Sequence, residues 1–251
     1  FAVIVGDLVF HGADEGHWAY FDHLALPLRN AKVPILPAAG NHEYWGNNER
    51  ALESMRARFE RLTGSTWYAD TYAGIGLIVL DTNEDEIGDD AWQRQVAWYG
   101  ETLTGFERDD SISAVIVFGH HAPYTNSPVV DGDENVQEAF VSGFCASRKT
   151  AAFMTGHAHG YEHFVRGPDQ GCGDRARHFI VTAGGGGPRP DELRPAGETG
   201  LTDEYAAPAP RPFNYVWVEP GEDALSLEVR GFDKGESAVR VIEQVTIAYA
   251  R

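Results

Sequence analysis

Apolar and polar positions follow two different periods along this chain. Apolar side chains recur at helical spacing in four segments, which predict helices over residues 15–30, 48–62, 90–103 and 134–144. Short apolar runs bounded by polar turns predict strands over residues 1–5, 33–38, 67–72, 75–80, 112–118, 151–154, 161–165, 178–182, 215–218, 224–229 and 239–246. Strands and helices alternate in the first half of the chain, and strands dominate the second half. This order predicts an α/β core with a second, more antiparallel sheet.

Four of the apolar runs end in a glycine that is followed by polar residues able to bind a ligand. These strand ends are Gly6-Asp7, Gly40-Asn41-His42-Glu43, Gly119-His120-His121 and Gly156-His157-Ala158-His159. Ligands of α/β proteins bind at the carboxyl ends of strands, and a glycine lets the backbone turn sharply and approach closely. We therefore expect the carboxylate, amide and imidazole groups to face a common edge.

The residue types at these strand ends are those of a divalent metal centre. Imidazole and carboxylate groups bind zinc, manganese and iron, and one carboxylate can bridge two ions. Two ions about 3.5–4 Å apart can hold a phosphoryl group and activate water. Each segment alone has an ordinary explanation as a turn or a packed histidine, but the four in this order favour a metal site.

In this order the four segments resemble the motif series of the calcineurin-like metallophosphoesterase superfamily. Leu80-Asp81-Thr82-Asn83, Gln95-Val96-Ala97-Trp98-Tyr99 and the glycine-rich stretch 179–187 fit the same series. Asn41-His42-Glu43 and residues 156–162 are most similar to the purple acid phosphatase branch. The resemblance implies a single metallophosphoesterase domain over residues 1–251. Its α/β fold would be a four-layer α-β-β-α sandwich with two mixed β-sheets and the metal site at the C-terminal ends of strands.

The resemblance also implies a set of metal ligands. Asp7 would bridge two ions. Asn41, His120 and His157 would complete the protein ligands of one ion, and His159 would bind the other.

Further roles follow for residues that do not bind metal. His42 would stabilise the transition state or protonate the leaving oxygen, and Glu43 would orient His42 by a hydrogen bond. His121, Tyr124 and Tyr161 are candidate substrate contacts, and each could equally be a packed side chain.

Two features depart from the purple acid phosphatase pattern. Phe10 stands where that branch carries a tyrosine, so no Fe(III)-tyrosinate is expected and the cofactors would be two divalent ions such as manganese, zinc or iron. The superfamily's first motif, Asp-x-His or Asp-x-Gly, should precede Gly6-Asp7, but only the Gly-Asp strand stands there. We expect that the N-terminal strand and first motif are missing upstream; the alternative is a form that holds one ion well and one poorly.

Composition narrows the choice of partners. The chain has 251 residues, with 20 Lys+Arg against 38 Asp+Glu and a net charge of −18. This charge opposes non-specific nucleic-acid binding, although a metal could still attract a small phosphorylated substrate. No apolar run is long enough to predict a membrane span, and the sequence does not indicate the oligomeric state.

Cysteine content bears on location. Cys145 and Cys172 could form one disulfide or stay unpaired. The polar loop around Cys172 favours the disulfide, and a disulfide favours an extracytoplasmic location.

These inferences predict metal-dependent hydrolysis of phosphate esters by metal-activated hydroxide, with a phosphomonoesterase favoured. The alternatives are a phosphodiesterase on the same core and a non-catalytic binding protein with an incomplete metal site.

Overall fold

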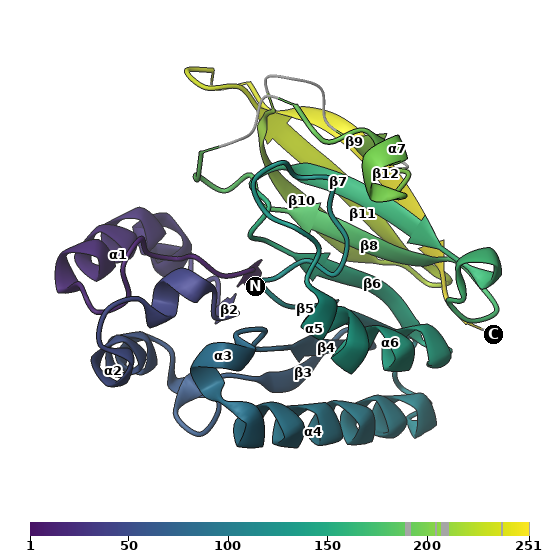
Figure 1. Cartoon of the computed structure of the whole chain (residues 1–251), viewed down its shortest axis with the longest axis horizontal. Helices are drawn as coiled ribbons and strands as arrows, with labels where there is room; N and C mark the ends of the chain where they lie inside the picture. Colours follow the sequence, from purple (N-terminus) through teal and green to yellow (C-terminus); the bar gives the residue numbers. More distant parts are fainter. Residues whose placement is uncertain (189–191, 204, 207–210, 237, 251) are drawn as a thin grey trace.

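The largest element of the fold is a mixed seven-stranded sheet (Figure 1). The computed structural model describes the chain except residues 189–191, 204, 207–210, 237 and 251. In spatial order the strands are β3 (Tyr68–Tyr72), β4 (Ile75–Val79), β5 (Ala114–Phe118), β6 (Thr150–Thr155), β8 (Arg177–Thr182), β7 (Tyr161–Arg166) and β9 (Tyr205–Ala206). The four central strands β4, β5, β6 and β8 run parallel, and antiparallel strands lie at both edges. The carboxyl ends of β5 and β6 therefore meet at one edge of this sheet.

Two smaller sheets pack against one face of this sheet. One is the parallel pair β1 (Ala2–Ile4) and β2 (Ile35–Pro37). The other is antiparallel and contains β10 (Phe213–Pro220), β11 (Ala224–Phe232) and β12 (Arg240–Ala248). All three sheets contribute buried side chains to one apolar core, among them Leu36, Leu77, Ile116, Leu225 and Val245.

Helices cover the other face of the large sheet and the outer side of the β1–β2 pair (Figure 1). α4 (Asp89–Arg108), α5 (Glu134–Val136), the π-helical turn Gln137–Val141 and α6 (Ser142–Ala146) cover the other face of the large sheet. Trp92, Tyr99, Phe140 and Phe144 form the core beneath them with Phe153 of β6. α1 (Glu15–Asn30) and α2 (Asn48–Arg58) pack on the β1–β2 side through Trp18, Phe21 and Met55. Short helical turns complete the connections: Asn41–Tyr44, Glu60–Leu62, α3 (Glu84–Ile87), Pro168–Gln170 and α7 (Ala196–Thr199).

The predicted α-β-β-α order of layers is confirmed, with one difference in the second layer. The strands facing the seven-stranded sheet form a parallel pair and a separate antiparallel sheet, where a single mixed sheet was expected. The outer side of the antiparallel sheet carries exposed Tyr215 and Trp217. Its short β10–β11 turn and antiparallel register make it a self-contained meander, which needs no pairing with β1 or β2.

A disulfide joins Cys145 of α6 to Cys172 in the loop before β8, as the sequence predicted, with 4.6 Å between the two Cα atoms. The bridge connects the helical layer to the start of a central strand. Among the described residues, we find no helix long and apolar enough to span a bilayer.

Replacing both cysteines tests the contribution of this bridge to stability. The bridge closes a loop of 27 residues in sequence, for which chain entropy predicts a contribution of about 3 to 4 kcal/mol. We expect C145A/C172A to lower the free energy of unfolding by this amount in urea denaturation. Reductant should destabilise the wild type to a similar extent and leave the double variant unchanged. Equal stabilities of oxidised and reduced wild type would contradict this prediction.

Candidate metal centre

The buried ring of His120 lies against three glycines that come from three different strand ends. A methyl group on Gly6, Gly40 or Gly156 would come within 3.2 Å of this ring, closer than ordinary carbon contacts allow. Gly6 also has a φ of +90°, a conformation that side chains disfavour. The glycines of the sequence motifs therefore make room for one imidazole between the ends of β1, β2 and β6.

Three of the functional candidates have strained backbones. Asp7, His157 and His159 have φ values of +55°, +61° and +51°. Left-handed conformations are uncommon for residues other than glycine and gather at functional sites. The turns after β1 and β6 thus hold these side chains in directions that a regular strand end would not provide.

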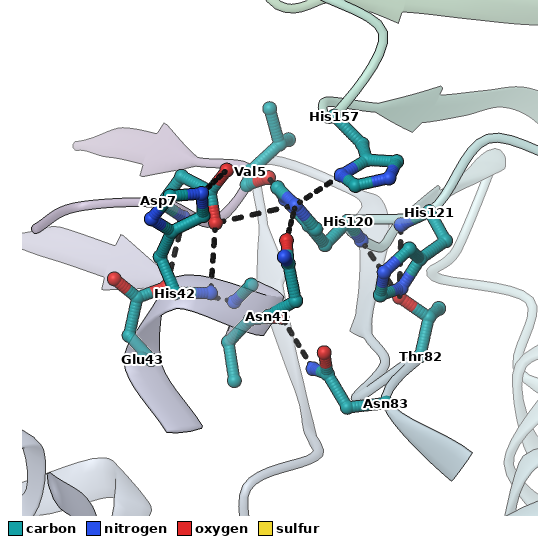
Figure 2. A network of polar contacts seen from close by, with 12 residues as sticks. Val5, Asp7, Asn41, His42, Glu43, Thr82, Asn83, His120, His121 and His157 are labelled. Carbon is teal, nitrogen blue, oxygen red and sulfur yellow. Dashed lines mark hydrogen bonds and ion pairs between the residues drawn. The ribbon is translucent and has the colours of Figure 1, made fainter. Parts of the chain in front are cut away.

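Three potential metal ligands converge on the Nε2 atom of His120, which would be the fourth (Figure 2). This nitrogen lies 3.1 Å from Asn41 Oδ1, 3.1 Å from His157 Nδ1 and 3.3 Å from Asp7 Oδ1. Atoms that bind one ion at about 2.0–2.2 Å lie roughly 3 to 3.5 Å from one another. The observed spacing fits a shared divalent ion, and the side chains come from the ends of β1, β2, β5 and β6.

Hydrogen bonding and charge support the same conclusion. His120 Nδ1 lies 2.7 Å from the Val5 carbonyl oxygen, which can only accept, so Nδ1 donates and Nε2 faces the other three groups. Burial opposes a charged His120, but the Asp7 carboxylate outweighs it and raises the pKa of this histidine. Burial likewise raises the pKa of Asp7, while contacts with His120 and His42 prevail and lower it to about 2. The cluster therefore favours a positive charge among its donors, which a proton or a metal ion can supply.

His121 extends this cluster. The ring nitrogens of His120, His121 and His157 lie within 4.8 Å of one another. Thr82 Oγ1 accepts hydrogen bonds from the backbone N–H groups of His120 and His121, and it lies 2.9 Å from His121 Nδ1. Burial and the neighbouring histidines lower the pKa of His121 to about 3. A neutral His121 beside the cluster is consistent with the predicted substrate contact, which stays a prediction.

The expected hydrogen bond between Glu43 and His42 is wrong. The side chains of adjacent residues in a 3₁₀ turn point about 120° apart, and the Glu43 carboxylate accepts hydrogen bonds from backbone N–H groups. His42 Nδ1 instead lies 2.7 Å from the Phe10 carbonyl oxygen, and its ring stacks on Trp45 at 3.7 Å between centroids. His42 is thus oriented by a backbone carbonyl and an indole ring.

Glu43 holds the backbone of the site. Its buried carboxylate accepts hydrogen bonds from the N–H groups of Asp7 at 2.8 Å, Gly40 at 2.8 Å and Val9 at 3.1 Å. Burial, followed by the charge of Asp7, raises the pKa of Glu43 to about 7. This carboxylate ties the turn after β1 to the turn after β2 and so sets the position of Asp7 relative to Asn41.

His159 lies outside the network around His120. Its Nδ1 is 2.5 Å from the Pro188 carbonyl oxygen, and a side chain on Gly187 would collide with its ring. This contact fixes the ring and directs its other nitrogen away from the carbonyl. The assignment of His159 to a second ion stays a prediction.

The two tyrosines predicted as substrate contacts have packing roles in the structure. Tyr161 is fully buried between the sheets, and its hydroxyl donates to Glu243 of β12. The Tyr124 ring packs edge-on against Phe179, with the Arg166 guanidinium 4.3 Å from its centroid. The substrate contact predicted for Tyr161 is therefore wrong, because its ring is buried in the core between the sheets. Tyr124 is only partly buried beside the other core, and its substrate contact stays a prediction.

Sequence reasoning gave no individual role to several residues that support the site. Gln95 of α4 exchanges two 2.8 Å hydrogen bonds with the backbone of Asp81, and Asn83 donates to the Ala39 carbonyl oxygen at 3.1 Å. The only sequence signal was the resemblance of the stretches that contain them. Glu162 accepts hydrogen bonds from Thr125 Oγ1 at 2.5 Å and from the Asn126 N–H at 2.7 Å, which ties the loop after β5 to β7.

Comparison with known proteins agrees with this site. A family model described as calcineurin-like phosphoesterase matches residues 1–161. This match covers more than half of the chain, and the chain belongs to this family.

Two relatives extend the comparison. The chain is 27% identical over 200 residues to purple acid phosphatase 22 of Arabidopsis thaliana, a match that covers 74% of this chain and 44% of that protein. The chain thus spans less than half the length of this curated relative. Its fold is similar to the crystal structure of a dimetal phosphatase from Danio rerio, with a TM-score of 0.61, 15% identity, and coverage of 98% of this chain and 83% of that one.

Glu162 predicts a pH dependence of stability that is separate from metal binding. Burial raises its pKa from 4.5 to about 7, against its hydrogen bonds with Thr125 and Asn126. The folded state therefore binds this proton more tightly than the unfolded state. The stabilisation is complete below about pH 4.5 and is lost as the pH rises through 7.

We expect the free energy of unfolding of the wild type, relative to E162Q, to fall by up to about 3 kcal/mol between pH 4.5 and pH 8. Urea denaturation at a series of pH values measures this difference. The exposed Glu138 provides the control variant E138Q. A difference between wild type and E162Q that does not change with pH would refute the prediction.

Proposed function

We propose that this chain hydrolyses phosphate esters with the help of two divalent metal ions, and that phosphomonoesters are its main substrates. The observation that carries the proposal is the convergence of Asp7, Asn41 and His157 on His120 Nε2 within 3.3 Å. Family membership supports the reaction class. The preference for monoesters is supported by the similarity to a purple acid phosphatase.

Two groups of residues would hold the ions, with Asp7 shared between them. Asn41, His120 and His157 would hold one ion together with Asp7, and His159 would contribute to the second. Phe10 offers no phenolate, which favours manganese, zinc or Fe(II) over a tyrosinate-bound Fe(III). Bound ions would supply Lewis acidity, which activates water and neutralises charge on the phosphoryl group.

His42 would act on the leaving group. Its Nε2 lies 3.9 Å from Asp7 Oδ2, on the same side as the metal ligands. Its Nδ1–H is held by the Phe10 carbonyl oxygen, which leaves Nε2 free to carry the proton given to a leaving oxygen. The stacked Trp45 ring limits rotation of the imidazole. These contacts suit a general acid that protonates the leaving oxygen, and they argue against a non-catalytic binding protein.

Net charge and the disulfide indicate the kind of substrate and the location of the protein. A net charge of −18 disfavours polyanionic partners, so the substrate would be small and reach the ions directly. The Cys145–Cys172 bridge supports an extracytoplasmic location, because disulfides persist in oxidising compartments. We propose that the 251 residues act as one metallophosphoesterase domain.

Removing the His42 side chain tests the catalytic assignment. We expect H42A to lower kcat for an alkyl phosphate by roughly 10² or more in the presence of Mn²⁺, while Mn²⁺ affinity stays close to that of the wild type. The control is H23A, which alters an exposed histidine of α1. Equal rates for H42A and wild type would remove His42 from the mechanism. A bis(4-nitrophenyl) phosphate rate that exceeds the 4-nitrophenyl phosphate rate would instead identify a diesterase.

Removing the His120 side chain tests the metal assignment without relying on turnover. Loss of a residue that only supports a ligand costs 10- to 100-fold in affinity. We expect H120A to weaken Mn²⁺ binding by more than about 100-fold in calorimetric titrations, because it removes a direct ligand. The H23A variant is again the control. Unchanged Mn²⁺ affinity in H120A would overturn the proposed ligand set.

A further inference from the structure

Three aromatic rings form a cluster beside the metal ligands. His42 stacks on Trp45 at 3.7 Å between centroids, and the Phe10 ring lies 5.2 Å from His42 and 5.7 Å from Trp45. Two of these rings reach solvent, with Phe10 65% exposed and Trp45 39% exposed. Single exposed apolar side chains are common, whereas a cluster of them beside a reactive group is typical of a ligand-binding surface.

The backbone of Phe10 orients His42, whereas its ring lies at the surface. Its carbonyl oxygen holds His42 Nδ1, which fixes the position of the residue. Its ring is directed outward and contacts His17 of α1 at 5.9 Å between centroids. The exposed ring is therefore held in a defined place, although no apolar core covers it.

A surface depression adjoins this aromatic cluster. Its volume is about 520 Å³, within the range of small-molecule sites, and Phe10, His11, Glu15, His17 and Arg50 are among its lining residues. The Phe10 ring contacts His17 on the depression side and His42 on the metal side. The depression is thus connected to the position of the leaving group by an aromatic surface.

We propose that Phe10 and Trp45 bind an aromatic ring in the leaving group, so that the preferred substrates are phosphate esters of aryl or arylmethyl alcohols. This inference rests on the proposed function. During hydrolysis a water oxygen forms a bond to phosphorus while the bond between phosphorus and the ester oxygen breaks. His42 Nε2 gives its proton to the departing oxygen, and the proton lost by water later restores His42. The carbon group on that oxygen is then next to the exposed rings.

The test compares benzyl phosphate with cyclohexylmethyl phosphate. The two esters have the same charge, similar size and leaving alcohols of similar acidity, and they differ in the aromatic ring. We expect the wild type to have the higher kcat/KM for the benzyl ester. One aromatic pair accounts for roughly a tenfold preference, so the ratio of the two kcat/KM values should fall by up to about tenfold in F10L. Leucine keeps an apolar side chain, which separates ring stacking from simple hydrophobic contact.

Control variants make the comparison specific. Y20A removes a 64% exposed ring on α1 and should leave the ratio unchanged. W45A should lower the ratio too, and it should also lower kcat for both esters because Trp45 supports His42. A ratio that is equal in wild type and F10L would overturn the inference and leave the proposed function standing.

A binding measurement separates this inference from the catalytic proposal. Benzylphosphonate and cyclohexylmethylphosphonate cannot be hydrolysed at the bond to carbon, and calorimetry reports their affinities for the Mn²⁺-loaded protein. We expect tighter binding of the benzyl compound by wild type and a loss of this preference in F10L. If neither ester is hydrolysed, the proposed function fails while the phosphonates still test the aromatic site. Equal affinities, or no binding of either phosphonate to the wild type, would overturn the inference.

Discussion

The close packing of one imidazole ring against three glycines determines the geometry of the whole site. Because Gly6, Gly40 and Gly156 surround His120, the ends of β1, β2 and β6 approach the ring more closely than any side chain would permit. The ring in turn presents Nε2 to Asp7, Asn41 and His157. Because the glycines have no side chain, the strand ends can approach the ring closely. The short side chains of Asp7 and Asn41 can then reach His120 Nε2. A β-carbon at any of the three positions would separate the ligands.

Hydrogen bonds to buried carboxylates complement this packing. Glu43 gathers three backbone N–H groups from the turns after β1 and β2, and Glu162 gathers two groups from the loop after β5. A carboxylate that accepts several N–H groups can be buried at modest cost, because its lone pairs are satisfied. The chain thus uses buried carboxylates, which bond to the backbone of Asp7 and to the loop after β5, to keep in place the turns and loops near the proposed metal ligands.

The sequence predicted the order of elements and most of the ligand cluster, because strand ends and their glycines are local features. The prediction of His120 as a metal ligand agrees with its central place in the cluster. Side-chain direction was predicted less well. Glu43 follows His42 directly, and adjacency in a 3₁₀ turn directs them apart. Tyr161 starts β7 after a turn with positive φ values, so alternation along the strand did not reveal which face it occupies.

The division of the second layer into two sheets has a mechanical consequence. β1 and β2 are held to the seven-stranded sheet by apolar packing, while the ladder hydrogen bonds stay within each sheet. The ligand cluster spans this boundary, since Asp7 and Asn41 follow the small sheet and His120 and His157 follow the large one. A cation bound there attaches to both bodies at once. Its binding free energy would therefore add to the cohesion between them, and local opening of the N-terminal layer would become rarer as the site fills.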